Sequence, residues 1–159
     1  MAGGPVTGYE ASFEPAMRAA LAEAEAAVAT GDVPVGAVIL DDAGAIVARG
    51  RNRREADVDP TAHAEIVAIR EAARAVGSWR LDRLTLVVTL EPCTMCAGAM
   101  VHGRLDRLVY ATADPKAGAC GSVLSVINHP QLNHQMQVDQ GILAEQSGDL
   151  LRGFFRERR

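Results

Sequence analysis

The sequence of 159 residues predicts a layered α/β domain. Two short apolar runs joined by a turn come first, and strand-like and helix-like segments alternate after them, which is the pattern of a sheet covered by helices. The length corresponds to one domain, which we place at residues 10–159, after a flexible tail at residues 1–9 that has no periodicity. A chain of this length buries roughly 70% of its unfolded surface, so it needs no disulfides to fold.

The first part of the domain predicts a helix followed by a β-hairpin. Apolar residues recur at helical spacing between residues 10 and 30, and Gly31 is placed to end the helix. The apolar run at residues 35–40 predicts a strand, 41–44 a turn, and 45–49 the returning strand.

A second helix and a central strand follow a polar stretch at residues 50–60. The expected buried stripe of the helix consists of apolar residues at helical spacing before Gly77: Ala62, Ile66, Ile69, Ala73 and Val76. The run at residues 84–90 is nearly all apolar, as expected for a strand covered on both faces. We then expect a short helix at residues 94–102 and a strand at residues 107–110.

The last part of the chain begins with an irregular stretch at residues 113–134. A loop of that length in a compact domain tends to be functional or to contain hidden structure. A strand near residues 135–138 and a helix at about residues 143–156 close the chain, and no internal repeat is present.

Composition narrows the class of protein. A hydrophobic fraction of 48% and a charged fraction of 23% are ordinary for a soluble globular protein and exclude intrinsic disorder. With 16 basic and 20 acidic residues the net charge is −4, which argues against coating of nucleic acid through bulk positive charge. A local basic surface remains open, because residues 152–159 form a compact arginine-rich end. Three cysteines, no secretory signal and no apolar run of ~20 residues predict a reducing cytoplasm.

Two short motifs carry the strongest functional signal. Thr61-Ala-His-Ala-Glu65 opens the second helix, and Glu91-Pro-Cys-Thr-Met-Cys96 joins the central strand to the next helix. Free amides and the helix dipole at a helix N-terminus favour thiolates, the form that binds zinc. Zinc readily takes a mixture of sulfur and imidazole nitrogen. We therefore expect His63, Cys93 and Cys96 to hold one Zn²⁺ per subunit.

We expect Glu65 to take part in proton transfer and not to act as a fourth ligand of the metal. Three protein ligands leave one tetrahedral position open for a water molecule, whose pKa the metal lowers toward ~7. A carboxylate beside that water can take its proton and later deliver protons to a substrate. Because positions i and i+2 face different ways on a regular helix, His63 and Glu65 can flank one cleft only at the first turn.

Two other interpretations of the cysteine pair stay open. A C-x-x-C motif can be a redox dithiol, although thioredoxin-like motifs usually lack an accompanying H-x-E. It can also be half of a structural zinc site that is completed by another residue of the chain: Cys120, His102, His129 or His134. No second C-x-x-C or H-x₃₋₅-H with standard spacing is present.

H-x-E followed 30 residues later by P-C-x-x-C is the signature of the zinc-dependent nucleobase deaminases. From about Ala11 to the C-terminus the sequence resembles the bacterial tRNA-specific adenosine deaminases. The resemblance also rests on segments outside the two motifs: Val33-Pro-Val-Gly-Ala-Val38, Asn52-Arg53, Gly118-Ala-Cys-Gly-Ser122, His129-Pro130, Asn133-His134 and Gly153-Phe-Phe-Arg156. Residues 1–9 have no counterpart, and Trp79 stands where we expect more variable residues.

The resemblance implies a fold, a reaction and partners. The fold is a cytidine-deaminase-like three-layer α/β/α sandwich around a mixed sheet of about five strands. The reaction is hydrolysis of adenosine to inosine at the wobble position of a tRNA anticodon, that of an arginine tRNA, with Glu65 as the proton shuttle. The target base must leave its stack, which is easiest in a single-stranded loop. The partners are an anticodon stem-loop and a second copy of the chain; Ala97, Met100 and Val101 are candidates for that interface or for the core.

The resemblance also assigns residues to the nucleoside pocket. Asn52 resembles the pocket residue that hydrogen-bonds the flipped nucleoside, and Val33 and Pro34 resemble the pocket wall. An asparagine that stabilises a turn and an ordinary loop-to-strand junction are the alternatives.

Three further residues match positions where the family contacts RNA. Asp114 is a candidate acceptor for a ribose 2′-OH and Lys116 a candidate phosphate contact; the alternative is a solvated turn. Of Phe154 and Phe155, which could stack on an unpaired base, we expect one to be structural and assign the RNA contact to Phe155.

These residues are compatible with three functions. The first is the tRNA adenosine deaminase described above. The second is a deaminase of free bases or nucleosides, such as guanine or cytosine, which has no need for the loop at residues 114–116 or the basic end. The third is an RNA-binding module with a structural zinc, in which Glu65 would have no use.

Overall fold

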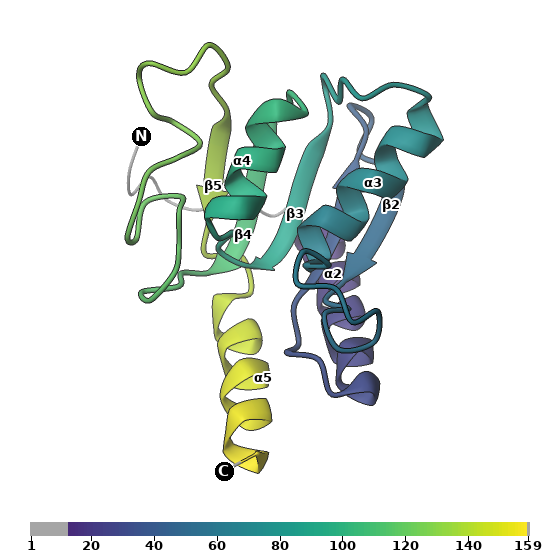
Figure 1. Cartoon of the computed structure of the whole chain (residues 1–159), viewed down its shortest axis with the longest axis vertical. Coiled ribbons are helices and arrows are strands. Elements are labelled where there is room, and N and C mark those ends of the chain that lie inside the picture. The colour runs from purple at the N-terminus through teal and green to yellow at the C-terminus, as the bar shows by residue number, and fades with distance from the viewer. Residues whose placement is uncertain (1–12, 159) are drawn as a thin grey trace.

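The computed structural model describes residues 13–158, so the tail expected at residues 1–9 lies outside the described residues. A five-stranded mixed sheet with the order β2-β1-β3-β4-β5 carries helices on both faces (Figure 1). The elements follow in chain order: α2 (Glu14–Ala27), the 3₁₀ turn η1 (Val28–Thr30), β1 (Gly36–Leu40), β2 (Ile46–Arg51), α3 (Ala64–Val76), β3 (Thr85–Leu90), α4 (Thr94–His102), β4 (Arg107–Thr112), β5 (Gln137–Gln140) and α5 (Ala144–Glu157). The expected fold class is confirmed.

The sheet separates two hydrophobic clusters. Alternate residues of a strand point to opposite faces, so Val38, Val87 and Val109 pack with α2, whereas Ile39 and Leu86 pack with α3 and α4. The central strand β3 is buried on both sides, as its sequence predicts. In the described part of the chain the three layers are therefore α2, the sheet, and the pair α3 and α4.

Two glycines bring helices unusually close to the sheet. A Cβ atom on Gly36 would lie 2.0 Å from the carbonyl oxygen of Ala20 in α2. One on Gly50 would lie 2.4 Å from the carbonyl oxygen of Ala64, in the first turn of α3. The strands can approach these helices because neither position carries a side chain.

The stripe expected on the second helix is partly wrong. Ala62 and Ile66 are buried, but Ile69 and Ala73 are only partly so, and Val76 is 44% exposed. The residues of α3 that face the sheet are instead small: Ala64, Ala68 and Ala72. The reason is that β2 approaches α3 closely at Gly50. Only side chains as small as a methyl group fit between the helix and the sheet there.

Other boundaries differ in detail. The described part of the first helix ends as a 3₁₀ turn, and Gly31 follows in the left-handed conformation with φ 76°. The helix α4 has the predicted bounds, whereas β5 begins two residues later than expected. Residues 113–134 are irregular apart from an isolated bridge between Cys120 and Ser125. The possible interface residues of α4 belong to the core of this chain: Ala97, Met100 and Val101.

One edge of the sheet collects the segments that matter for function. β3 and β4 run parallel, and β2 runs in the same direction because both β2 and β3 are antiparallel to β1. The carboxyl ends of β2, β3 and β4 and the amino end of β1 therefore lie at the same edge of the sheet. Helix α5 projects beyond this edge (Figure 1). Within residues 13–158 no helix has the length and apolar character to span a membrane.

Candidate active site

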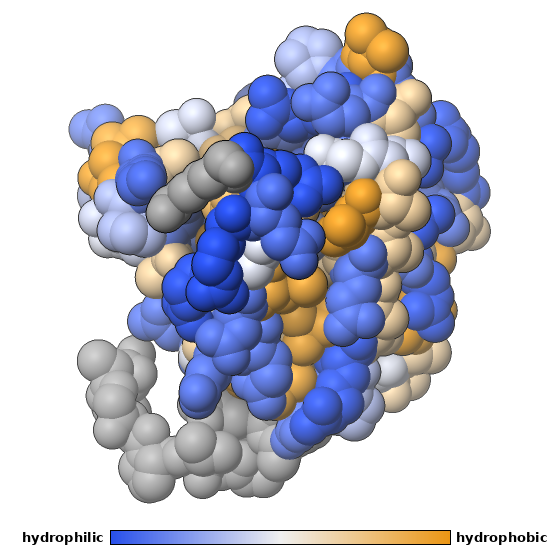
Figure 2. All heavy atoms as spheres, turned by 90° about the horizontal axis from the view of Figure 1, so that it is seen from below, coloured by the Kyte–Doolittle hydropathy of each residue, from blue (hydrophilic) through white to orange (hydrophobic). Residues whose placement is uncertain are grey.

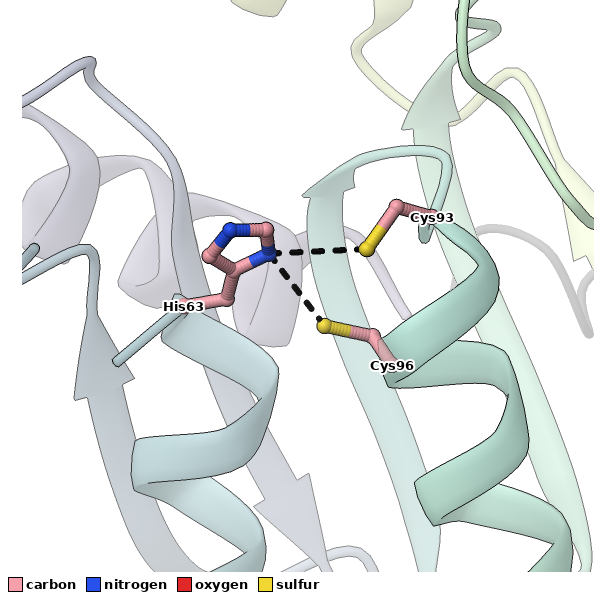
Figure 3. Close-up of side chains that lie close together, drawn as sticks. All are labelled: His63, Cys93 and Cys96. Carbon is pink, nitrogen blue, oxygen red and sulfur yellow. Dashed lines mark hydrogen bonds between the residues drawn. The ribbon is translucent and has the colours of Figure 1, made fainter. Parts of the chain in front are cut away.

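The two sequence motifs meet at the N-termini of two helices. His63 is the residue before α3, with an extended backbone (φ −71°, ψ 155°), and Cys93 holds the same position before α4. Cys96 lies in the first turn of α4. The three side chains point toward one another, and Nδ1 of His63 lies 3.5 Å from each of the two sulfur atoms (Figure 3).

The spacing of these three atoms fits a metal ion. A tetrahedral zinc bound at ordinary Zn–S and Zn–N distances separates sulfur from nitrogen by roughly 3.5–3.6 Å. All three ligand atoms lie within 4.8 Å of one another, and among residues 13–158 this is the one such group of His, Cys, Asp or Glu side chains. Cys120, His102, His129 and His134 are not part of it. Within the described residues, three side chains could thus hold a metal ion together, and none of the four candidates for completing a structural site lies with them.

The protonation of the two thiols is asymmetric. Hydrogen bonds from Cys96 and His63 hold the pKa of Cys93 far below that of a free thiol, at about 3. The hydrogen bond to Cys93, together with burial, raises the pKa of Cys96. The pair therefore already favours one thiolate, which is the form that binds a metal.

Glu65 lies beside this group but is not one of its members. It is 4% exposed, and burial raises the pKa of its carboxyl group to about 7. It occupies the first turn of α3, which is the condition that the two-residue spacing from His63 imposes. A cavity of about 180 Å³ is lined by Glu65, His63 and Cys93 together. A buried carboxyl group with a pKa near neutrality can both accept and release protons at physiological pH.

The wall of this cavity contains part of the expected nucleoside pocket. Val33 and Asn52 line it, whereas Pro34 is buried and its neighbour Val35 takes that place. The side-chain amide of Asn52 donates to the carbonyl of Val33, and its oxygen accepts from the backbone amide of Arg54. Asn52 therefore stabilises the local turn and also faces the cavity, so both interpretations of this residue describe part of its environment.

A second cavity of about 520 Å³ adjoins the first. The two share Val33, Leu90 and Asp114 in their walls. Lys116, Arg152 and Phe155 line the larger one. Phe155 is 51% exposed, whereas Phe154 is 7% exposed, so one of the two aromatic residues is structural, as expected.

The sequence analysis assigned no role to three charged residues of this region, although one of them, Glu91, opens the second motif. Arg54 and Glu91 line the first cavity, and the buried Asp32 directly precedes Val33 in its wall. Asp32 accepts hydrogen bonds from the backbone amides of Glu55 and Ala56. A buried acid after Gly31 has no spacing pattern that distinguishes it from a turn residue, so only the folded chain shows its role.

The chain is similar to curated and solved proteins along most of its length. The family model of the MafB19-like deaminases matches residues 11–159. A tRNA-specific adenosine deaminase from Haemophilus influenzae is 48% identical over 92% of this chain and 84% of its own length. One from Bacillus subtilis is 46% identical over 90% of this chain and 88% of its own length.

Solved structures agree with these relatives. A structure from a study of A-to-I editing by tRNA:A34 deaminases has a TM-score of 0.83 and 43% identity, covering 86% of this chain and 99% of its own. A guanine deaminase from Nitrosomonas europaea has a TM-score of 0.74 and 25% identity over 89% of this chain and 83% of its own. The fold is thus common to deaminases with different substrates.

Proposed function

The chain belongs to the tRNA-specific adenosine deaminases, and we propose that it converts adenosine to inosine at the wobble position of a tRNA anticodon. The observation that carries this proposal is the group of His63, Cys93 and Cys96 with the carboxyl group of Glu65 in the same cavity. An RNA-binding module with a structural metal would have no use for Glu65 in that place.

The metal is zinc in this proposal, held by His63, Cys93 and Cys96. The donor set and the 3.5 Å separations support it. A bound zinc ion acidifies a water molecule and so makes a nucleophile available at neutral pH. The two thiol ligands and the buried carboxylate are supplied by the chain before substrate arrives.

Glu65 is the proton shuttle. It accepts a proton from the attacking water, donates one to N1 of adenine as the bond from oxygen to C6 forms, and transfers the second proton to the departing amine. Water and adenosine are consumed, and inosine and ammonia are released. The pKa of about 7 for this carboxyl group supports a role in which it is protonated and deprotonated within one cycle.

The RNA lies across both cavities in this proposal. The flipped adenine enters the smaller cavity, with Asn52 and Val33 at its wall. Flanking nucleotides lie over the larger one, where Asp114 accepts from a ribose 2′-OH, Lys116 contacts a phosphate and Phe155 stacks on an unpaired base. Arg54, Lys116 and Arg152 place positive charge around the cavities of a chain whose net charge is −4.

The surface at this end of the molecule is compatible with a polar partner. Figure 2 views the end from which α5 projects, and hydrophilic side chains cover most of that face, with a small hydrophobic area near its middle. Phosphate contacts from a few arginines and one lysine predict modest affinity that depends strongly on salt.

The identity of the tRNA, the assembly and the compartment complete the proposal. An arginine tRNA is the expected substrate, and a homodimer the expected assembly. Exposed apolar side chains of the irregular segment, Val123 and Leu124, offer a surface for a second copy. The cysteines are free in the structure, which supports a reducing cytoplasm.

The test uses purified zinc-loaded protein and an anticodon stem-loop of an arginine tRNA with adenosine at the wobble position. Mass spectrometry should find inosine at that position and none when guanosine replaces the adenosine. A mixture of guanine and cytidine is incubated in parallel. Ammonia from the small molecules alone would keep the hydrolytic mechanism and reject the tRNA substrate, and no product from either would favour a structural metal.

A further inference from the structure

The carboxylate of Glu91 is buried under a loop that lines both cavities. Glu91 directly follows β3 and is 2% exposed. Its two oxygens accept hydrogen bonds from the backbone amides of Asp114 and Cys120 at 3.0 Å and of Ser122 at 3.1 Å. The Ser122 hydroxyl donates a further bond to it. All four donors belong to residues 114–122, which we call the 114–122 loop.

The backbone on both sides reinforces this arrangement. The amide of Glu91 donates to the carbonyl of Thr112, and the amide of Ala119 donates to the carbonyl of Pro92. Gly118 lies so close that a Cβ atom there would be 2.3 Å from the carboxyl carbon of Glu91. The loop is therefore folded directly around this side chain, and Gly118 must remain without one.

The 114–122 loop carries residues that face the substrate region. Asp114 and Ala117 line the smaller cavity, and Asp114 and Lys116 line the larger one. One carboxylate oxygen of Asp114 accepts from the amides of Lys116 and Ala117, so the start of the loop is a fixed turn. The orientation of that turn relative to the rest of the protein depends on the bonds to Glu91.

Glu91 also precedes Cys93 by two residues. The same short segment thus holds a metal-binding thiol at one end and the centre of the loop's hydrogen bonds at the other. We propose that Glu91 is a positioning residue for substrate recognition, which fixes the 114–122 loop relative to the metal-binding residues before RNA binds. Glu91 is among the residues that line the smaller cavity, but both of its carboxylate oxygens accept hydrogen bonds from the loop, so it acts on the substrate through Asp114 and Lys116. The proposal takes the RNA substrate from the proposed function above.

The first variant is Glu91→Gln, which preserves size but replaces one acceptor oxygen by a donor that faces amide donors. Hydrogen exchange on the full-length, zinc-loaded protein should show that amides of the 114–122 loop exchange roughly tenfold faster or more, while those of α3 and α4 are unchanged. Zinc content should stay at about one ion per chain, as the ligand set predicts. KM for the stem-loop should rise roughly tenfold with kcat almost unchanged.

The matched control is Asp41→Asn. Asp41 also accepts hydrogen bonds from two backbone amides, those of Ala43 and Ala45, but in the turn between β1 and β2 at the opposite edge of the sheet. This variant should change neither KM nor exchange in the 114–122 loop. A rise in KM equal to that of Glu91→Gln would mean that any loss of stability has this effect, and would overturn the proposal.

A double variant tests the route of the effect. If Glu91 acts through Asp114, then Glu91→Gln combined with Asp114→Ala should raise KM no more than the larger of the two single effects. Multiplication of the two effects would overturn the proposal. So would an unchanged KM and a protected loop in Glu91→Gln, or a loss of zinc and kcat with KM unchanged.

Two further variants cover a failure of Glu91→Gln to fold. Ser122→Ala removes one bond to the carboxylate, and Gly118→Ala pushes a methyl group against it; neither changes the metal-binding segment. Both should loosen the loop and raise KM, and normal values in both would contradict the role. If the wild-type protein does not deaminate the RNA, the proposed function fails, whereas hydrogen exchange still shows whether Glu91 fixes the loop.

Discussion

Nδ1 of His63 lies 3.5 Å from Sγ of Cys93, although 30 residues separate them and each precedes its own helix. Neither side chain forms a capping hydrogen bond with its helix. Both are therefore free to turn toward a shared ion, while the first-turn amides of two helices provide a positive field for thiolates. β2 and β3 run in the same direction, so the connections from these strands to α3 and α4 bring the two N-termini to one edge of the sheet.

Glu65→Gln should slow turnover sharply and leave the metal bound. The carboxyl group is buried beside the metal-binding group but is not part of it, so its loss removes the proton shuttle alone. We expect kcat for the stem-loop to fall by about a hundredfold or more. Zinc content and RNA affinity should match those of the wild type and of Glu71→Gln, an exposed control on the same helix. Normal turnover in Glu65→Gln would contradict the mechanism.

Removal of the metal should distinguish a zinc site from a redox dithiol. A zinc-bound protein should resist alkylation at Cys93 and Cys96, because both sulfurs are ligands, and a chelator should expose them and stop deamination. Added zinc should restore activity without any reductant or oxidant. Activity that follows the redox potential of the buffer and ignores the chelator would revive the dithiol interpretation.

Lys116→Ala should weaken RNA binding in a salt-dependent way. The residue is exposed, lines the larger cavity, and carries a charge suited to a phosphate. Loss of one such contact reduces the slope of log K against log salt by about 0.7–1. Arg80→Ala is the control, since Arg80 is exposed and paired with Asp82. An unchanged slope for Lys116→Ala would remove it from the contacts.

The sequence predicted the parts of the site that depend on local rules. Cys93 and Cys96 are three residues apart in one helical turn, and His63 starts a helix whose onset is marked by Asp59-Pro60, so their chemistry is visible in the motifs. The long-range contacts were not visible. Glu91 accepts a hydrogen bond from the backbone amide of a residue 31 positions away, and Asp32 accepts one from a residue 24 positions away. No periodicity in the sequence marks an acidic residue that bonds to distant backbone amides. Likewise, the predicted stripe on α3 is partly wrong because periodicity reports which residues are apolar and not how close the helix backbone lies to the sheet.

Asp32→Asn should lose stability at neutral pH but not in acid. Burial alone would raise the pKa of Asp32, but hydrogen bonds from Thr30, Glu55 and Ala56 outweigh it and hold the pKa below the usual value. A carboxyl group with a lowered pKa in the folded state stabilises the protein fully above its unfolded pKa, and this contribution disappears as the pH falls through the folded pKa.

We expect the free energy of unfolding of Asp32→Asn to be lower by about 2 kcal/mol at pH 7, because several bonds to a charged acceptor are weakened. The difference from the wild type should shrink below about pH 4. Urea unfolding across this range provides the measurement. A difference that is constant with pH would mean that the charge of Asp32 contributes nothing.

Gly50→Ala should disturb the site from the opposite side of α3. A Cβ atom at this position would lie 2.4 Å from the carbonyl oxygen of Ala64 and 2.7 Å from the amide of Ala68, and both contacts are to backbone. Because backbone cannot rotate away, α3 must shift, at a cost of about 1–3 kcal/mol in unfolding free energy. Its first turn carries Glu65 and follows His63, so zinc affinity should fall together with stability. Gly98 lies inside α4, and apart from its chain neighbours and its own helix backbone no atom lies within 4 Å of an added methyl group, so Gly98→Ala should be neutral or stabilising by about 0.5–1 kcal/mol. Wild-type stability and zinc affinity in Gly50→Ala would show that the sheet tolerates a wider spacing from α3, and that this contact does not set the position of His63.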